Sequence, residues 1–351
     1  MRTMSHQQLD NLIAEIPHES WEQNLPIGRF LRVEHLQSIT RPFSYISRSR
    51  IVGDRDARVV FIKLYRNTRK RSHEKMIEKI RNDYEIARFW YDHFADSPRY
   101  RVVRPVLALP EQYLFASEES SGEDLYQLIL QKAAFFPAVD DLQLLCDHLR
   151  RVGEWLQYKL SVMNQAGARY RIEDLQAYMD VRLKLLSEDA RRGFPLSLRK
   201  RVLDYLDARG GAVPENDLGV SISHSDFNPS NILVSSEAVT VLDFGRMVEE
   251  NDLLDLSKLH FQLGLLTFKP QYRRAAIGRL QEALLEGFGD GAAEQRLMFR
   301  MLTMRNILTH LAGISQFWKQ GAKEKLYNRW VMRKELEMLE KLLRMEDAGQ
   351  M

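Results

Sequence analysis

Two short stretches carry the most information in this 351-residue sequence: residues 224–231, which read HSDFNPSN, and residues 241–245, which read VLDFG. Both put oxygen-bearing side chains in polar loops beside short strand-like pieces. Asn231 and Asp243 offer amide and carboxylate oxygens, which suit Mg²⁺ because this ion fills its octahedron with water and phosphate oxygens. Asp226, five residues before Asn231, can accept a proton from an attacking hydroxyl or orient it.

Phosphoryl transfer is the reaction that such a set of side chains serves best. The transfer needs in-line positioning and neutralisation of phosphate charge, and little covalent help from the protein. One aspartate at the nucleophile and two oxygen ligands for a metal meet that need. The two stretches therefore predict an ATP- and Mg²⁺-dependent phosphotransferase.

The sequence on either side predicts a mixed architecture. Before residue 118, five strand-like segments at 30–39, 43–52, 58–65, 101–109 and 112–117 surround one helical stretch at 72–94. From Leu125 onward helical patterns dominate, interrupted only by short strand-like pieces between 219 and 244. We expect a small sheet lobe at 1–118 and a larger, mainly helical lobe at 119–351.

The pattern His-x-Asp-x-x-x-x-Asn, followed by Asp-Phe-Gly, resembles the aminoglycoside phosphotransferase and choline kinase-like superfamily. The resemblance covers roughly residues 30 to 265. It implies an α+β, bilobal protein kinase-like fold with a five-stranded antiparallel sheet in the small lobe. It also implies that Asp226 is the catalytic base, that Asn231 and Asp243 are Mg²⁺ ligands, and that His224 supports the loop.

Other residues fit the same resemblance. Lys63 falls on the third strand, where the family places a lysine that holds the nucleotide phosphates. Residues 114–118, followed by Gly122, resemble the strand and hinge that bind adenine, which makes Glu118 a candidate for nucleotide contact. Asp255 matches an aspartate that anchors the catalytic loop in this family.

The partner of Lys63 is predicted from the helix at 72–94. Asp83 shares a helix face with Met76, Ile80, Ala87 and Trp90, which should turn toward the lobe interior. A buried carboxylate needs a cation, and Lys63 is the candidate. The family usually carries Glu at this place, so Glu85 stays open as the alternative partner.

The stretch between the first two strands lacks the Gly-x-Gly-x-x-Gly motif of protein kinases. Residues 36–44 read LQSITRPFS instead, and their hydroxyls at Ser38, Thr40 and Ser44 are candidates to cover the phosphates. Ser225 and Asn228 stand where protein kinases carry arginine and lysine. These departures favour a small-molecule kinase over a protein kinase.

Composition limits the other classes of function. The formal net charge is +3, which gives no reason to expect nucleic acid as a partner, and hydrophobic residues make up 44% of the chain. The single cysteine, Cys146, excludes an internal disulfide. The first residues lack a secretory signal and the apolar run 261–268 is too short to span a bilayer, so we expect a cytoplasmic protein.

The acceptor is the least determined part of the prediction. Residues 251–351, which should form its wall, hold 16 Lys or Arg against 12 Asp or Glu, which favours a neutral or anionic sugar or glycan precursor over a polycation. The basic run at 66–81 is either a solvated surface or a contact for an anionic substrate, a phosphorylated glycan or a membrane surface. The oligomeric state stays open.

Three other functions compete with the kinase. A pseudokinase module should have lost Asp226, Asn231 or Asp243, yet all three are present. A Ser/Thr protein kinase is the second rival. A metal hydrolase built on His224, Asp226 and His260 is the third, but its histidines lack the spacing of ligands on one helix face.

Overall fold

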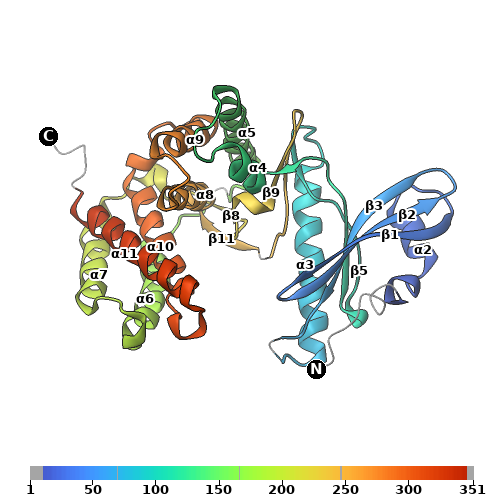
Figure 1. Cartoon of the computed structure of the whole chain (residues 1–351), viewed down its shortest axis with the longest axis horizontal. Coiled ribbons are helices and arrows are strands. Elements are labelled where there is room, and N and C mark those ends of the chain that lie inside the picture. Colours follow the sequence, from blue (N-terminus) through green and yellow to red (C-terminus); the bar gives the residue numbers. More distant parts are fainter. Residues whose placement is uncertain (1–10, 69, 166, 246, 346–351) are drawn as a thin grey trace. The chain divides into compact units, whose positions relative to one another are not determined.

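The computed structural model describes residues 11–68, 70–165, 167–245 and 247–345, which form two compact units (Figure 1). Unit 1 holds the described residues up to Glu123 together with those of the segment 231–247. Unit 2 holds residues 124–230 and the described residues from Val248 onward. The predicted division has one boundary at 118/119. The structure instead groups the Asp-Phe-Gly segment with the sheet-containing unit.

Unit 1 is built on a five-stranded sheet in the order β1-β2-β3-β6-β5, with every neighbouring pair antiparallel. This confirms the predicted sheet, and together with the larger helical part it confirms the predicted fold class. The strands are β1 (Phe30–Arg41), β2 (Ser44–Gly53), β3 (Ala57–Tyr65), β5 (Pro105–Leu109) and β6 (Leu114–Glu118).

The fourth predicted strand, 101–109, is wrong in its extent. The structure divides it into β4 (Tyr100–Val102) and β5, which begins at Pro105. β4 belongs to a different sheet, where it pairs in parallel with β10 (Val239–Val241). The sequence offers one mark of this division, Pro105, whose ring nitrogen carries no hydrogen to donate to a ladder.

The two faces of the five-stranded sheet are covered by different segments. On β3, Val60 and Ile62 are fully buried in a core shared with residues 13–27, which include α2 (His18–Asn24). The alternate residues Lys63 and Tyr65 point to the opposite face, because side chains alternate along a strand. There Tyr65 packs against α3 (His73–Phe94), which begins one residue later than the predicted helix. Figure 1 shows α3 beside the sheet.

The second sheet of unit 1 brings distant parts of the chain together. β9 (Ile232–Val234) and β10 form an antiparallel hairpin, and β10 also pairs with β4. Phe244, just after this hairpin, stacks on Trp90 of α3 with ring centroids 4.7 Å apart. These contacts explain why residues 231–247 belong to unit 1. β7 (Glu123–Asp124) marks the end of the first part of this unit.

Unit 2 is mainly helical and contains one two-stranded sheet, β8 (Val220–Ser223) paired antiparallel with β11 (Val248–Asn251). The predicted helices at 172–187 and 196–209 are present within one residue. The helices are α4 (Leu125–Lys132), α5 (Val139–Met163), α6 (Ile172–Glu188), α7 (Leu196–Arg209), α8 (Leu254–Leu265), α9 (Arg274–Gly287), α10 (Leu297–Ile314) and α11 (Ala322–Arg344).

Helices α5 and α9 approach so closely that two glycines are needed. A Cβ at Gly153 would lie 2.3 Å from the carbonyl oxygen of Leu284, and a Cβ at Gly287 would lie 1.8 Å from that of Arg150. Neither backbone oxygen can move without disturbing its helix. The close approach fixes the position of α5, whose buried face supports the loop that carries Asp226.

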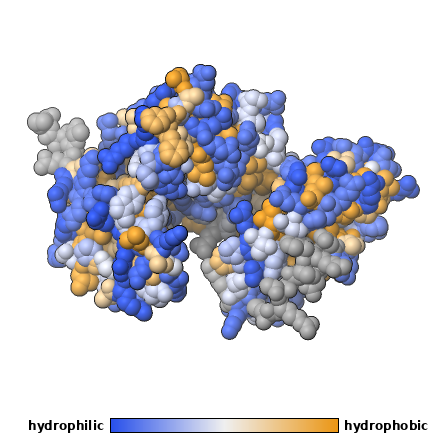
Figure 2. Space-filling view, viewed as in Figure 1, coloured by the Kyte–Doolittle hydropathy of each residue, from blue (hydrophilic) through white to orange (hydrophobic). Residues whose placement is uncertain are grey.

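No helix in the described part of the chain has both the length and the apolar composition needed to cross a bilayer. Among the residues coloured in Figure 2, hydrophobic ones form separate patches bordered by hydrophilic ones. Exposed apolar residues are ordinary on the surface of a folded protein.

Candidate active site

The loop that carries Asp226 leaves β8 of unit 2 through a sharp turn. Ser225 has φ +62°, in the left-handed region, and the N–H of Asp226 donates to the carbonyl oxygen of His224 at 2.8 Å. The next turn is closed by Asn228, whose side chain accepts from the Ser230 N–H at 3.0 Å. Left-handed backbone at a residue other than glycine is uncommon, and such positions concentrate at functional sites.

Buried aromatic rings hold the loop in place. Phe227 is fully buried and stacks on Trp155 of α5, with ring centroids 5.4 Å apart. His224 is also fully buried and meets Phe227 edge-on at 5.8 Å. Its burial fits the predicted supporting role of His224.

Asp255 anchors the loop from the first turn of α8. Its carboxylate accepts hydrogen bonds from the His224 N–H at 3.0 Å and the Ser223 hydroxyl at 2.8 Å. It also pairs with Lys159 of α5 at 3.0 Å, and both side chains are only 1% exposed. Burial raises the pKa of Asp255, but Lys159 and the hydrogen-bond donors outweigh it and bring the pKa below its ordinary value. Lys159 was not predicted from the sequence.

Lys258 is a second residue that sequence reasoning missed. It lies three residues after Asp255 on α8, so the two side chains share a helix face. Its ammonium donates to the Asp226 carboxylate at 2.8 Å and to the Ser225 carbonyl oxygen at 2.7 Å. The i, i+3 spacing from Asp255 was the available signal, but it became meaningful only once Asp255 was known to face the loop.

Asp226 is held in its ionised form. Partial burial raises the pKa of this carboxyl, but the charge and hydrogen bond of Lys258, with His224 and Asn228, outweigh that effect and lower the pKa below its ordinary value. A carboxylate with a lowered pKa is a weak general base. Its better-suited role is to accept a hydrogen bond from a hydroxyl and orient it.

Asn231 and Asp243 lie at the same end of the β9–β10 hairpin in unit 1. Ile232 pairs with Val241, and beyond that pair the Leu242 N–H donates to the Asn231 carbonyl oxygen at 2.9 Å. Asp243 has φ +61° and its side chain is 64% exposed. Asn231 and Asp243 therefore lie at one end of the hairpin, and the amide and carboxylate oxygens that they carry are donors of the kind that suits a hydrated Mg²⁺.

Lys63 and Asp243 lie together within unit 1, with Lys63 Nζ 3.5 Å from Asp243 Oδ1. The ammonium also lies 5.0 Å from the centroid of the Tyr65 ring. Part of the lysine is accessible, since its side chain is 29% exposed. A strand residue and a residue after the distant hairpin are thus brought together, as a phosphate and metal site requires.

The predicted pair between Lys63 and Asp83 is not formed. Asp83 does lie on the inner face of α3, with its side chain only 14% exposed, but it binds Lys79 at 2.6 Å and the Tyr65 hydroxyl at 2.7 Å. Lys79 is one helical turn before Asp83, so it reaches the short carboxylate more easily than a residue on β3 can. Tyr65 lies between the two lysines, with Lys79 Nζ 5.1 Å from its ring centroid.

Glu118 is already engaged within unit 1. Its carboxylate lies 3.2 Å from Arg104 Nη1, and its N–H donates to the Arg104 carbonyl oxygen at 2.9 Å. The next residue, Glu119, accepts two hydrogen bonds from the Arg48 guanidinium and donates its N–H to Val59. The carboxylate and the N–H of Glu118 are therefore both engaged within the unit, and neither is left for the adenine contact predicted for this residue.

The tip between β1 and β2 is a tight turn in which Arg41 pairs with Ser44. Of the three hydroxyl residues predicted to cover the phosphates, Ser44 is buried and Ser38 is bonded to His35 Nε2 at 3.0 Å. In the basic run 66–81, Lys79 is paired with Asp83, and residue 69 lies outside the described residues.

A cavity of about 560 Å³ in unit 2 contains Asp226 on its wall. Its volume lies within the range usual for small-molecule sites, about 300–1,000 Å³. It is bordered by α4, α8, α10 and α11 and lined by Tyr126, Asp226, Lys258, Phe261, Gln262, Leu265, Leu266, Phe268, Lys269, Asn306, Thr309, His310, Gly313, Ile314, Tyr327, Asn328 and Val331.

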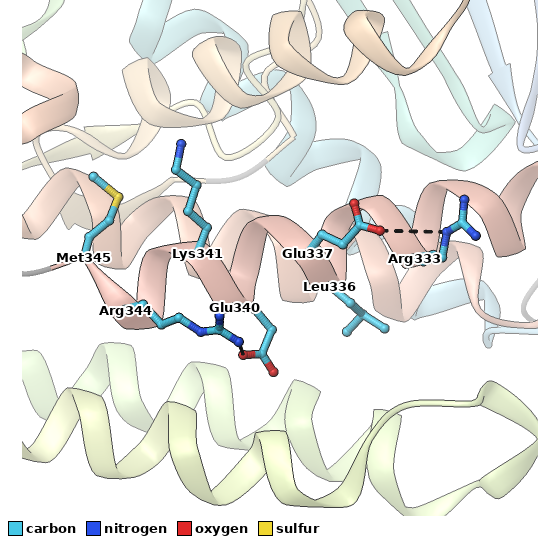
Figure 3. Close-up of a pocket in the computed structure, with 7 residues that line it drawn as sticks. All are labelled: Arg333, Leu336, Glu337, Glu340, Lys341, Arg344 and Met345. Atoms are coloured by element: carbon cyan, nitrogen blue, oxygen red, sulfur yellow. Dashed lines mark hydrogen bonds and ion pairs between the residues drawn. The ribbon is translucent and has the colours of Figure 1, made fainter.

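A second hollow, along α11, lacks the features of a site. Its lining residues project from successive turns of that one helix and diverge, as Figure 3 shows. Two ion pairs run along the helix, with Arg344 Nη2 3.3 Å from Glu340 and Arg333 Nε 3.9 Å from Glu337. This arrangement is a solvated helix face. Within the described residues, moreover, no three His, Cys, Asp or Glu side chains cluster in a way that could hold a metal.

Comparison with known proteins confirms the resemblance at the level of the fold. The aminoglycoside phosphotransferase APH(2'')-Ib with ADP bound superposes with a TM-score of 0.53 at 11% identity, covering 97% of each chain. A choline kinase from Cryptosporidium parvum Iowa II gives 0.55 at 11% identity, covering 94% of this chain and 96% of that one. A glucosamine kinase with glucosamine, ADP and inorganic phosphate gives 0.52 at 12%, covering 95% and 98%.

No protein-family model and no curated protein matches the sequence itself. The similarity is therefore one of fold, which extends over nearly the whole chain.

Proposed function

We propose that this protein transfers the γ-phosphate of ATP to a hydroxyl group of a small molecule, a sugar or a glycan precursor. The observation that carries the proposal is the Lys63–Asp243 contact, because it joins a phosphate-binding cation to a metal-binding carboxylate at the end of the Asn231 hairpin. The solved structures that share the fold include kinases for aminoglycosides, choline and glucosamine.

Each candidate residue takes a definite role in this proposal. Lys63 binds the nucleotide phosphates, and the hinge beyond Glu118 binds adenine through backbone groups. Asp226, kept ionised by Lys258, orients the acceptor hydroxyl for in-line attack and receives its proton as the new bond to phosphorus forms. The γ-phosphorus–oxygen bond breaks and ADP leaves.

Magnesium would be held by Asn231 and Asp243 and would neutralise charge on the ATP phosphates. The exposed carboxylate of Asp243 and its place beside Lys63 are what such a site needs.

The arrangement favours an active small-molecule kinase over two of its rivals, the pseudokinase and the protein kinase. A pseudokinase has no need for a carboxylate held ionised by a dedicated lysine, as Asp226 is by Lys258. A protein kinase needs an open surface for a peptide, whereas Asp226 lies on the wall of a cavity bordered by four helices.

The test is a screen of sugars and other metabolites for phosphate acceptance from labelled ATP with Mg²⁺, run beside the Asp226→Asn variant. We expect label in a small molecule and a rate about 10²–10⁴-fold lower in the variant. Label that appears in protein instead would favour the protein kinase. Equal rates for the parent and the variant would refute the assignment of Asp226.

A further inference from the structure

The cavity beside Asp226 has an unusual charge balance. Four ionisable side chains other than tyrosine line it: Asp226, Lys258, Lys269 and His310. Asp226 is its one carboxylate, and that group already faces Lys258 at 2.8 Å. Their two charges compensate each other, so this pair adds no net charge to the cavity.

His310 contacts a carboxylate that lies outside the cavity wall. Its Nδ1 is 2.5 Å from the carboxylate of Glu335 on α11, and the Glu335 side chain is fully buried. Any positive charge on the imidazole is therefore matched by Glu335, while the ring remains part of the cavity wall. Phe261 meets the same ring edge-on at 6.1 Å and limits its movement.

Among the described residues that line the cavity, Lys269 is the cation whose charge no carboxylate balances. Its ammonium bonds the neutral Tyr126 hydroxyl at 3.3 Å, and within the described residues it forms no ion pair with a carboxylate. Tyr126 comes from α4 and Lys269 follows the short turn after α8, so two elements converge on this corner of the cavity. An uncompensated ammonium and a hydroxyl in a concave site form a receptor for an oxyanion.

We infer that the acceptor is an anionic hydroxyl compound whose carboxylate or phosphate group is bound by Lys269 and Tyr126. This inference rests on the proposed function, because it takes the Asp226 cavity as the acceptor site. The apolar wall, which includes Phe261, Leu265 and Phe268, contacts the carbon skeleton. A cationic acceptor is disfavoured, because it would meet Lys269 and find no carboxylate free of a lysine.

The test measures binding by the parent protein of four hexoses that differ in charge: glucose, glucosamine, glucuronate and glucose 6-phosphate. Ligand-observed NMR in the absence of ATP gives the dissociation constants. We expect glucuronate or glucose 6-phosphate to bind about tenfold or more tightly than glucose, because a hydrogen bond to a charged group is the difference between them. The preference between the two anions distinguishes a carboxylate receptor from a phosphate receptor.

Three variants test whether Lys269 causes the tighter binding of the anionic sugars. Lys269→Gln should abolish the advantage of the anionic sugars, and Lys269→Arg should retain it. Lys323→Gln, which removes an exposed lysine that does not line the cavity, should leave it unchanged. Glucosamine binding as tightly as the anions, an anion preference that survives in Lys269→Gln, or no anion-dependent binding in the parent would each overturn the inference.

This outcome is separable from the proposed function. If anions bind through Lys269 but no phosphate is transferred from ATP, the anion receptor stands and the kinase proposal fails. If phosphate is transferred to glucosamine faster than to either anion, the kinase proposal stands and the inference about the acceptor fails.

Discussion

Two Asp–Lys pairs, one in each unit, contain the same chemical groups in opposite surroundings. In unit 2, Asp255 and Lys159 are each 1% exposed, and the carboxylate also accepts from Ser223 and His224. In unit 1, Asp243 is 64% exposed and lies 3.5 Å from Lys63. The first carboxylate has its oxygens occupied by the protein, whereas the second offers them to solvent and to ligands.

This difference in burial separates a pair that stabilises the fold from a pair that can bind a ligand. A buried pair stabilises only when every donor and acceptor is matched, and then it has nothing left to offer a ligand. An exposed pair contributes little to stability but can exchange its partner for metal or phosphate. The Asp226–Lys258 pair resembles the exposed one, since the Asp226 side chain is 63% exposed.

The largest effect is expected from Asp243→Ala. Metal and phosphate positioning should fail together, so kcat/KM should fall by more than the factor of about 10²–10⁴ expected for Asp226→Asn. Steady-state kinetics with the acceptor found in the screen measure it. The stability of this variant should be nearly the same as that of the parent. A large loss of stability would mean that Asp243, like Asp255, serves mainly to stabilise the fold.

The next effect is on folding. Lys159→Met leaves the Asp255 carboxylate buried without its cation, which should lower the free energy of unfolding by about 3–5 kcal/mol. Urea denaturation followed by circular dichroism measures it. The matched control is Lys200→Met, whose partner Asp204 lies on the surface, and there the change should be below about 1 kcal/mol.

The same pair also predicts a pH dependence of stability. The pKa of Asp255 is lower in the folded than in the unfolded protein, so its contribution is present at neutral pH. That contribution is lost as the pH falls through the folded pKa. Lys159→Met should therefore lose less stability on acidification than the parent. An equal loss in both proteins would contradict this account of the pair.

A smaller effect is expected at Lys258. Replacing it with Met removes the charge that lowers the pKa of Asp226, so that pKa should rise. The acid limb of the kcat/KM profile should then move to higher pH, because Asp226 must be ionised to accept the hydrogen bond of the acceptor hydroxyl. A lower rate with an unmoved acid limb would mean that Lys258 acts only through the shape of the loop.

The smallest effect is expected at Lys79. Because Asp83 pairs with Lys79 and not with Lys63, Lys79→Met should leave the KM for ATP unaltered. Lys63→Met should raise that KM. If Lys79→Met raised the KM for ATP as much as Lys63→Met does, the Lys79–Asp83 pair would contribute to nucleotide binding and this account would be wrong.

Local patterns predicted the fold well because they are strongly periodic. The strand segments followed from their β-branched and aromatic residues and the helices from the spacing of their apolar residues, while the bilobal fold was implied by the family resemblance. The division of 100–109 did not, since it depends on β10, a strand some 130 residues later along the chain. The local sequence marks the division only through Pro105 and carries no sign of the parallel pairing itself.

The candidate site was predicted less completely than the fold. The spacing of Asp226, Asn231 and Asp243 is local and could be recognised, but the partners of these carboxylates are not local. Lys159 and Lys258 look like ordinary helix residues until α5 and α8 are packed around the loop. Asp83 was placed on the correct face of α3, yet its partner was wrong because a lysine one turn away competes with a lysine across the sheet.

The most direct test of the central claim is calorimetric titration of ATP, with and without Mg²⁺, into the parent and into Asp243→Ala. If Asn231 and Asp243 hold the metal beside Lys63, Mg²⁺ should tighten ATP binding in the parent, and this gain should disappear in the variant while weak metal-free binding through Lys63 persists. An equal gain from Mg²⁺ in both proteins would contradict the claim.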